Sequence, residues 1–331
     1  MKILYIGNTS THDQHVRGIV PSHWLYGAVE MEADGHDVIW SDESQAWFND
    51  IKLLKQYQPD SIFVPNLNLR SHILLLLLSS IHVIRIPIYA YLHHEPKVKK
   101  GLKSLLYRIL LSGVTHIFFL SRKTMEETTA CGIVKSCKCS VPGWGPDTKF
   151  YDNAASQVSP DSEDGEWFVS TGKECRDFDI LIEAFKRVPQ AKLHILTAKA
   201  HAGANYEDLP SKCENLPNIK VTLMENSGNS FPVMLDAMMR ARALVCPLKR
   251  DKLNYCVGLS TIADAEGLPK PLIITRNPYH SAARVKNFNV VESVEDWVNA
   301  INELLNKKKC RIESDYSMRK CYEQMKMHLY K

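Results

Sequence analysis

The stretch that decides the fold is Gly258-Leu-Ser-Thr-Ile-Ala-Asp264-Ala-Glu-Gly-Leu-Pro-Lys270-Pro-Leu-Ile-Ile-Thr275. It predicts a glycine loop, a short helix, a turn and a buried strand. A helix that starts after a glycine offers free backbone N–H groups and the positive end of its dipole, which suit a diphosphate. Asp264 lies about one and a half helical turns further on, where its carboxylate could meet a ribose. The alternative is a helix–turn–strand joint without a ligand.

The composition indicates a soluble protein with room for two cores. The chain has 331 residues, of which 45% are hydrophobic and 24% charged, as in an ordinary globular protein of two domains. A net charge of +4 without a DNA- or RNA-binding motif argues against nucleic acid as a partner. The nine cysteines are scattered, and no signal peptide or apolar run long enough to cross a bilayer is visible. We therefore expect a cytoplasmic protein with free thiols.

Strands and helices alternate along both halves of the chain, which predicts an α/β protein with parallel sheets. The polar stretch 151–166 contains turn-forming residues and is the predicted linker. We expect one domain over 1–155 and another over 165–312, with the helix 314–331 packing back on the first. Strands are expected at 3–6, 37–40, 61–64, 83–91, 116–120, 167–170, 192–197, 219–224, 243–246, 272–274 and 290–291. Helices are expected at 22–33, 47–58, 70–80, 97–112, 179–187, 231–242 and 294–306.

Four segments carry a resemblance to a known family, and they occur in that family's order. They are Gly35-His-Asp-Val38, Val141-Pro-Gly-Trp-Gly-Pro-Asp-Thr-Lys-Phe150, the stretch Ser170–Phe185, and the stretch 258–275. Together they resemble the motifs of GT-B glycosyltransferases, in particular the GT4-like group. The resemblance implies two Rossmann-like domains that face each other across a cleft. It also implies a nucleotide-sugar donor on the second domain and an acceptor on the first.

The segment Ser170–Phe185 supplies the first predicted donor loop. Gly172 ends a strand and lets the backbone approach a ligand closely. Lys173 and Arg176 bring two cations to the same loop, and a guanidinium matches phosphate oxygens bidentately. Fixed cations and N–H donors would stabilise a leaving diphosphate without a metal. The alternative is that both charges are solvated loop residues.

The remaining donor-binding candidates lie further along the second half. They are Thr222 and Met224, expected beside the base, then Gly258, Leu259, Ser260 and Thr261 beside the diphosphate, and Asp264 beside the ribose. Asp177-Phe-Asp179 has the spacing of an Asp-x-Asp metal site, but an aspartate just before an apolar helical run is usually an N-cap. We therefore expect no metal site there and no cofactor, the nucleotide sugar being a co-substrate.

Candidates in the first half follow two predicted strands. His93, His94 and Glu95 end a strand, at the edge where open α/β sheets bind ligands. A neutral imidazole can hydrogen-bond a sugar or act as a base; the alternative is a histidine with a backbone partner. The loop with Thr9, Ser10 and His12 follows strand one and lacks the dinucleotide pattern Gly-x-Gly-x-x-Gly. In the family the equivalent loop faces the cleft and touches the acceptor or the donor phosphates. These three residues, together with Glu95, are the acceptor-side candidates.

The predicted helix 97–112 combines lysines with a stripe formed by Leu102, Leu105, Leu106 and Ile109. Such a helix suits an anionic membrane surface. It equally suits an ordinary helix whose apolar stripe faces the core, and this second interpretation is the commoner one. Peripheral contact with the inner face of the membrane is therefore an alternative to a fully cytoplasmic location.

One position departs from the family pattern. Many members carry two acidic residues eight apart in the last motif; Asp264 matches the second, and the first falls on Cys256. Asn254 or Asp251 in the same loop could compensate for it.

The sequence therefore predicts a glycosyltransferase of the hexosyltransferase type. Retention of anomeric configuration, without a metal, is what the resemblance implies. The expected partners are a nucleotide-sugar donor and a glycan or lipid-linked acceptor, with a role in polysaccharide biosynthesis. His93, His94, Lys173 and Arg176 are the catalytic candidates. The alternatives are a non-catalytic nucleotide-sugar-binding protein and a GT-B nucleotide-sugar 2-epimerase.

Overall fold

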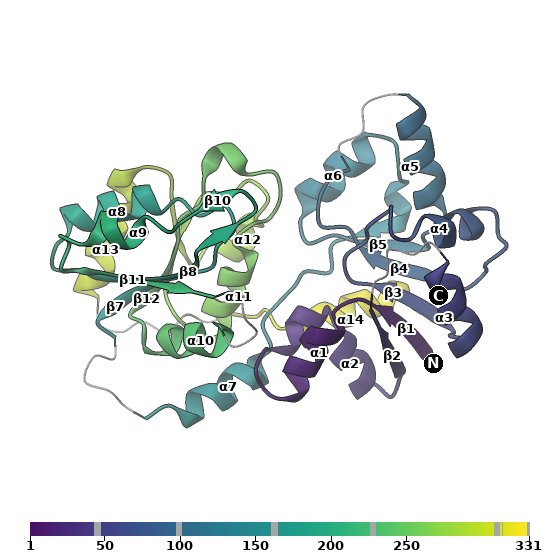
Figure 1. Cartoon of the computed structure of the whole chain (residues 1–331), viewed down its shortest axis with the longest axis horizontal. Coiled ribbons are helices and arrows are strands. Elements are labelled where there is room, and N and C mark those ends of the chain that lie inside the picture. The colour runs from purple at the N-terminus through teal and green to yellow at the C-terminus, as the bar shows by residue number, and fades with distance from the viewer. Residues whose placement is uncertain are drawn as a thin grey trace. The chain divides into compact units, whose positions relative to one another are not determined.

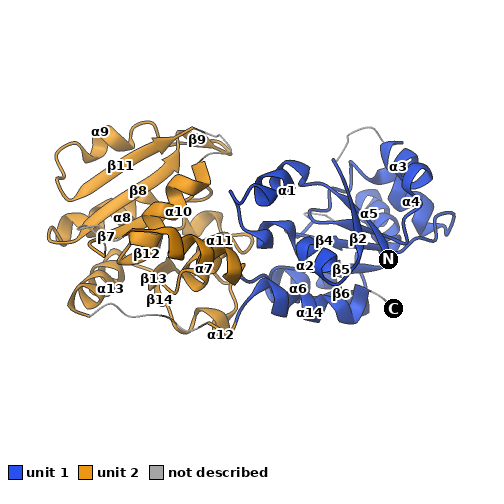
Figure 2. Ribbon diagram, turned by 90° about the horizontal axis from the view of Figure 1, so that it is seen from below, with its two compact units in different colours: residues 1–145, 316–331 blue, residues 146–315 orange. Residues whose placement is uncertain are grey.

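The computed structural model describes residues 1–42, 48–96, 101–159, 165–225, 230–307, 312 and 314–329. The chain forms two compact units, Met1–Gly145 with Tyr316–Lys331 (unit 1) and Pro146–Asp315 (unit 2) (Figure 2). Each unit has its own parallel six-stranded sheet and its own apolar core. The predicted α/β class with two Rossmann-like domains is therefore confirmed. The division after Gly145 lies before the position 155 at which we expected the first domain to end.

The sheet of unit 1 has the strand order β2-β1-β3-β4-β5-β6, and all neighbouring strands are parallel. Its strands are β1 (Lys2–Ile6), β2 (Asp37–Ser41), β3 (Ser61–Val64), β4 (Ile88–Tyr91), β5 (His116–Phe118) and β6 (Cys139–Ser140). Short apolar runs such as β3, which is buried throughout, suit a sheet covered by helices on both faces. The strand expected at 83–91 begins only at Ile88, after Pro87, which has no N–H to donate to a ladder.

The helices of unit 1 differ from expectation near the N-terminus. They are α1 (Thr9–Val16), η1 (Ser22–Leu25), α2 (Ala28–Ala33), α3 (Asn49–Tyr57), α4 (Ile73–Ser80), α5 (Leu102–Ser112), α6 (Arg122–Ala130) and η2 (Ser136–Lys138). The prediction of one helix over 22–33 was wrong, because Tyr26 (φ 50°) and Gly27 (φ 92°) adopt left-handed conformations that separate η1 from α2. Helices α1 and α6 were not predicted, and the loop expected at Thr9, Ser10 and His12 is the start of α1.

The last helix, α14 (Met318–Leu329), belongs to unit 1 (Figure 1). It lies against α2 and β5. The hydroxyl of Tyr91 donates to the sulfur of Met325 at 3.4 Å, and the ring of His328 stacks on that of His116 at 4.1 Å. Apolar burial on one face thus fixes the end of the described chain to the first sheet.

The sheet of unit 2 has the order β11-β8-β7-β12-β13-β14, again with parallel neighbours. Its strands are β7 (Trp167–Thr171), β8 (Lys192–Ala198), β11 (Ile219–Met224), β12 (Ala243–Cys246), β13 (Leu272–Thr275) and β14 (Asn289–Val291), and a small hairpin consists of β9 (Ala200–His201) and β10 (Ala204–Asn205). Its helices are α7 (Thr148–Gln157), α8 (Phe178–Arg187), α9 (Leu209–Cys213), α10 (Ser230–Arg240), η3 (Arg250–Lys252), α11 (Leu259–Gly267), α12 (Ala282–Val285) and α13 (Val294–Asn306).

The predicted linker 151–166 was wrong over its first half, which belongs to α7. Asp147 caps this helix by accepting a hydrogen bond from the N–H of Phe150 at 3.1 Å. Tyr151, one turn in, is buried. Residues 160–164 of the expected linker lie outside the described residues. The N-cap prediction for Asp177 is confirmed, because its carboxylate accepts from the N–H of Ile180 at 3.4 Å at the start of α8.

Both sheets contain a point where the strand order reverses. In unit 2 the chain runs outward from β7 to β8 and β11, then crosses to β12 on the other side of β7. In unit 1 the chain runs from β1 to β2 on one side, then crosses to β3 on the other side of β1. Open α/β sheets bind ligands outside the carboxyl ends of the strands at such switch points. The loops that matter most are therefore those that follow β7 and β12, and those that follow β1 and β3.

Candidate functional site

The loops after β7 and β12 are fastened to each other at the switch point of unit 2. The N–H of Asp177 donates to the carbonyl of Pro247 at 3.2 Å, and the N–H of Lys249 donates to the carbonyl of Cys175 at 2.9 Å. Arg176 and Leu248 form an isolated antiparallel bridge. The sequence predicted each loop as a diphosphate contact, and the structure places the two side by side.

Arg176 connects three parts of this region. Its side chain is 3% exposed. Nε and Nη2 donate to the carbonyl of Thr171 at 3.2 and 3.1 Å, and Nη1 donates to the carbonyl of Glu174 at 3.1 Å. Nη2 also donates to Oγ1 of Thr261 in α11 at 3.1 Å. Four of the five guanidinium donors thus have acceptors within the unit. Arg176 positions the loop and α11, and its direct contact with a phosphate stays a prediction.

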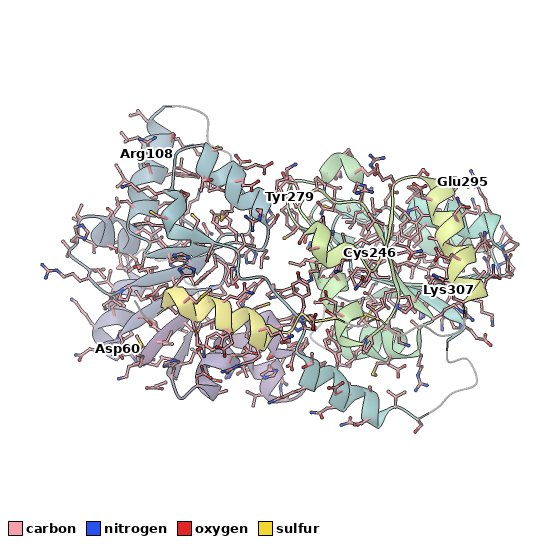
Figure 3. The ribbon with its side chains drawn as sticks, turned by 180° about the vertical axis from the view of Figure 1, so that it is seen from behind. Asp60, Arg108, Cys246, Tyr279, Glu295 and Lys307 are labelled. Atoms are coloured by element: carbon pink, nitrogen blue, oxygen red, sulfur yellow. The ribbon has the colours of Figure 1, made fainter. Side chains whose placement is uncertain are left out.

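Two predicted glycines are required by the packing beneath them. Gly172 has φ 96°, and a Cβ there would lie 2.5 Å from Nη2 of Arg176. Gly258 has φ 89°, and a Cβ there would lie 3.2 Å from Sγ of Cys246, at the end of β12 (labelled in Figure 3). A side chain at either position would combine an unfavourable backbone conformation with a contact. The glycines keep the backbone of both loops close to the strand ends.

The N-terminus of α11 carries the remaining predicted diphosphate contacts. No side chain caps it. The N–H of Leu259 donates to the carbonyl of Cys256 at 3.1 Å, whereas the N–H groups of Ser260 and Thr261 have no acceptor within the helix. Leu259 and Thr261 are buried, whereas Ser260 is exposed and can present its hydroxyl together with these N–H groups. Helix α11 thus has the features of an anion site that were expected from its sequence.

Side chains from the loop after β13 hold the segment that precedes α11. Nδ2 of Asn277 donates to the carbonyls of Tyr255 and Val257 at 3.0 and 3.1 Å, and Nε2 of His280 lies 2.9 Å from the carbonyl of Val257. Burial lowers the pKa of His280 to about 4, so the ring is neutral at pH 7. Because a carbonyl only accepts, Nε2 carries the proton. The sequence reasoning missed both residues, since their partners are distant carbonyls.

Cys256 occupies the position where the family pattern has its first acidic residue. It is 3% exposed, and burial raises its pKa to about 12. The thiol is therefore neutral and directed into the protein, so it does not replace a carboxylate. Asp251 and Asn254 are exposed in the same loop; a compensating role for either stays a prediction.

Of the other predicted donor-binding residues, Lys173 lies in one of the two glycine loops, and Thr222 and Met224 lie in the edge strand of the sheet. Lys173 lies in the loop after β7, partly exposed, and its carbonyl accepts from the hydroxyl of Tyr206 at 2.9 Å. Thr222 and Met224 lie in β11, the strand that was expected at 219–224. That strand is at the sheet edge, and the Thr222 hydroxyl is 2.8 Å from Nε2 of His194. The structure therefore does not bring them together with the two glycine loops.

Asp264 is buried beneath the N-terminal turns of α11. Its carboxylate accepts from the hydroxyl of Tyr151 in α7 at 2.6 Å. Burial raises the pKa of Asp264 to about 7, while Tyr151 and Arg176 oppose the rise. The tyrosine itself fits because the next turn has Gly267, where a Cβ would lie 2.2 Å from its ring. Asp264 thus fastens α7 to α11, and its contact with a ribose stays a prediction.

The buried carboxyl of Asp264 makes stability depend on pH. The folded state holds a proton that the unfolded state releases near pH 4, so the free energy of unfolding falls as pH rises from about 4 to about 7. We expect Asp264→Asn to remove this fall, which amounts to about 4 kcal/mol for a shift of about three pKa units. Urea unfolding at pH 4.5 and pH 8 measures this. The stability of Asp264→Asn relative to wild type should be greater at pH 8 than at pH 4.5. Asp251→Asn, at an exposed loop position, is the control; an equal difference at both pH values for Asp264→Asn would contradict the assignment.

In unit 1 the loops after β1, β3 and β4 adjoin one another. A Cβ on Gly7, after β1, would be 3.5 Å from the ring of Pro65, after β3. Nε2 of His93, after β4, lies 3.0 Å from the carbonyl of Pro65. Burial lowers the pKa of His93 to about 4, so the imidazole is neutral at pH 7. With Nε2 donating to a carbonyl, Nδ1 carries the lone pair. The alternative of a histidine with a backbone partner therefore holds for Nε2 of His93, which donates to the carbonyl of Pro65.

The other candidates of unit 1 point to different places. Thr9 and His12 lie in the first turns of α1; the hydroxyl of Thr9 donates to Asp42, and His12 stacks on Trp40 at 4.0 Å, both beside β2. Ser10 and His94 are exposed. Glu95 accepts from the thiol of Cys131 at 3.1 Å, at the end of α6. The structure therefore groups His93 with Gly7 and Pro65, and leaves Thr9, His12 and Glu95 with other partners.

No protein-family model matches the chain, and no curated protein matches it in sequence. Solved structures do match. A putative UDP-N-acetylglucosamine 2-epimerase from Listeria monocytogenes has a TM-score of 0.59 at 12% identity, over 99% of this chain and 96% of that one. UDP-GlcNAc 2-epimerase from Neisseria meningitidis, bound to UDP-GlcNAc, has 0.56 at 12%, over 99% of both chains. Anabaena Alr3699/HepE in complex with UDP has 0.57 at 13%, over 99% and 94%.

At these identities the likeness establishes the fold, and function has to be argued from the site. The likeness supports the GT-B fold, whereas the narrower GT4-like assignment has no matching family model and stays a prediction. Among the described residues, no group of three or more His, Cys, Asp or Glu is arranged to hold a metal ion. None of the described helices combines the length and apolarity needed to cross a bilayer.

Proposed function

We propose that the chain binds a UDP-sugar at the switch point of unit 2 and acts as a nucleotide-sugar 2-epimerase. The observation that carries the proposal is the fastening of the two glycine loops to each other through Arg176, which donates to Thr171 in β7 and to Thr261 in α11. A fixed pair of backbone loops at a switch point is the arrangement that open α/β sheets use for phosphate-containing ligands. UDP is the nucleotide bound in several structures of this fold.

The diphosphate would bind between groups that face outward from these loops. The exposed hydroxyl of Ser260 and the N–H groups of Ser260 and Thr261 in the first turn of α11 would supply neutral donors at the positive end of the helix. Lys173 supplies a cation in the loop after β7. Together they would stabilise the negative charge that a UDP leaving group gains when its bond to the sugar breaks. Arg176, behind them, would keep their spacing fixed.

Two observations favour epimerisation over glycosyl transfer. The full-length structural matches with TM-scores of 0.59 and 0.56 are described as UDP-GlcNAc 2-epimerases. In addition, the first acidic residue of the glycosyltransferase motif is replaced by Cys256, whose buried neutral thiol cannot supply its charge. Glycosyl transfer keeps one argument, the four collinear segments with a GT4-like pattern, and is therefore the second candidate.

Epimerisation at C2 can proceed without an oxidant when proton loss is coupled to departure of the diphosphate. A base removes the C2 proton, the electron pair forms a C1–C2 double bond, and the bond from C1 to the UDP oxygen breaks. UDP then adds back to C1, and C2 takes a proton on its other face, so all atoms are restored. A catalytic role for His93, in unit 1, stays a prediction.

Incubation of the protein with UDP-GlcNAc in D₂O tests this proposal. We expect proton NMR to show the 2-epimer and deuterium at C2 of the nucleotide sugar, because the proton delivered to C2 comes from solvent. Lys173→Ala should slow the exchange by weakening the hold on the diphosphate, while Lys186→Ala, at an exposed position on α8, is the matched control. Release of UDP together with free sugar that keeps its C2 proton, the sugar having been transferred to water, would instead favour a glycosyltransferase. Binding of UDP-GlcNAc without any turnover would identify a non-catalytic binding protein.

A further inference from the structure

Helix α5 exposes the apolar stripe that an ordinary amphipathic helix would bury. The residues Leu102, Leu105, Leu106 and Ile109 have exposed fractions of 86%, 52%, 39% and 39%. Their spacing of three, four and seven residues places them on one face of the helix. The core is contacted by another face, through Leu110 and Leu111, which are 1% and 0% exposed. The interpretation that the stripe faces the core was therefore wrong.

Helix α5 is cationic, with Lys103 and Arg108 and no acidic residue, and basic residues outnumber acidic ones in the chain on either side of it. Residues 61–130 contain nine Lys and Arg and three acidic residues, Glu95, Glu126 and Glu127, whereas the whole chain has 41 basic and 37 acidic residues. Lys103 and Arg108 are exposed on α5 (Arg108 is labelled in Figure 3), and successive residues of a helix are 100° apart, so they lie on opposite sides of the stripe. Segment 97–100 adds three lysines by sequence but lies outside the described residues.

We propose that α5 docks flat on an anionic lipid surface, independently of the proposed epimerase activity. The four apolar side chains of the stripe would enter the boundary between headgroups and acyl chains, and Lys103 and Arg108 would extend to lipid phosphates on either side. A second copy of the chain fits this surface less well. Two-fold pairing of α5 would bring like charges together, with no acidic residue on the helix to compensate.

Vesicle flotation with the full-length protein tests this proposal. We expect binding to vesicles of phosphatidylglycerol and phosphatidylcholine, and much weaker binding to phosphatidylcholine alone. The double variant Lys103→Gln/Arg108→Gln should lower the partition coefficient about 30-fold, since each cation near an anionic membrane contributes about fivefold. Added salt should weaken binding in the same way. Lys186→Gln/Lys220→Gln, at two exposed positions of unit 2, is the control for charge.

The apolar contribution is tested by Leu105→Gln/Leu106→Gln, which should abolish flotation. Its control is Val233→Gln in α10, an exposed apolar residue of unit 2. Circular dichroism of each variant should match wild type, because all of these side chains are exposed. Equal flotation of wild type and both α5 variants would overturn the proposal. A second result would also overturn it: wild type that is a dimer by light scattering and does not bind the vesicles, and a Leu105→Gln/Leu106→Gln variant that is a monomer. Neither result depends on turnover of a nucleotide sugar.

Discussion

Replacing Arg176 with alanine is expected to lower the free energy of unfolding of unit 2 by about 3–5 kcal/mol. The side chain is buried and makes four hydrogen bonds, to Thr171, Glu174 and Thr261. Truncation leaves buried carbonyls without their donors and opens a space below Gly172. Thermal unfolding should show a decrease of about 10 °C in melting temperature.

Arg176→Lys separates the shape of this side chain from its charge. An ammonium group cannot reach all of the guanidinium's acceptors from one position, so the lysine variant should remain destabilised and should bind UDP weakly. The matched control is Arg187→Ala in the same unit, whose half-exposed side chain pairs with Glu183 and Glu295 and should contribute less than about 1 kcal/mol. If Arg176→Ala were as stable as this control, Arg176 would not be the link between β7 and α11.

The second large effect is expected for Glu266→Leu, which should lower the free energy of unfolding by about 3–5 kcal/mol. Glu266 in α11 accepts from Nε and Nη2 of Arg284 in α12 at 3.0 and 2.5 Å, and the two side chains are 2% and 5% exposed. Removing the carboxylate leaves a guanidinium that is buried without its counter-charge. Urea unfolding of Glu266→Leu should report this loss directly.

The double variant Glu266→Leu/Arg284→Met decides whether the loss comes from the stranded charge. Buried ion pairs replaced by apolar residues of similar volume are often neutral in stability, so the double variant should recover most of the loss. Glu292→Leu is the control, because its pairs with Arg250 and Arg276 are exposed. A double variant that is no more stable than Glu266→Leu would show that these side chains act through packing.

The parts of the fold that the sequence predicts well are those with local signals. Short stretches rich in β-branched and apolar residues predicted β3, β11 and β12 with their observed bounds, and the periodic segment 294–306 predicted α13. Helix α7 was missed because its exposed polar residues are typical of a linker. Its position is fixed by Tyr151, whose partners, Asp264 and Gly267, lie more than one hundred residues away in the sequence.

The candidate site shows the same distinction. Glycine and basic residues predict where phosphate-binding loops occur, and the structure joins the loops of Gly172 and Gly258 at one switch point. The sequence cannot tell a cation that meets a ligand from one that holds the loop. Arg176 and Lys173 are three residues apart, yet one is buried among backbone carbonyls and the other is partly exposed. Only the tertiary acceptors of Arg176 separate the two roles.

The central claim is that the outward-facing groups of unit 2, behind which Arg176 lies, bind a diphosphate. Calorimetric titration of UDP and of uridine into the full-length protein tests it most directly. We predict saturable binding of UDP, at least tenfold tighter than that of uridine, and about a tenfold loss for UDP alone in Lys173→Ala. Lys186→Ala, at an exposed position on α8, should bind UDP as wild type does. Equal affinity for UDP and uridine, or unchanged UDP affinity in Lys173→Ala, would contradict the account.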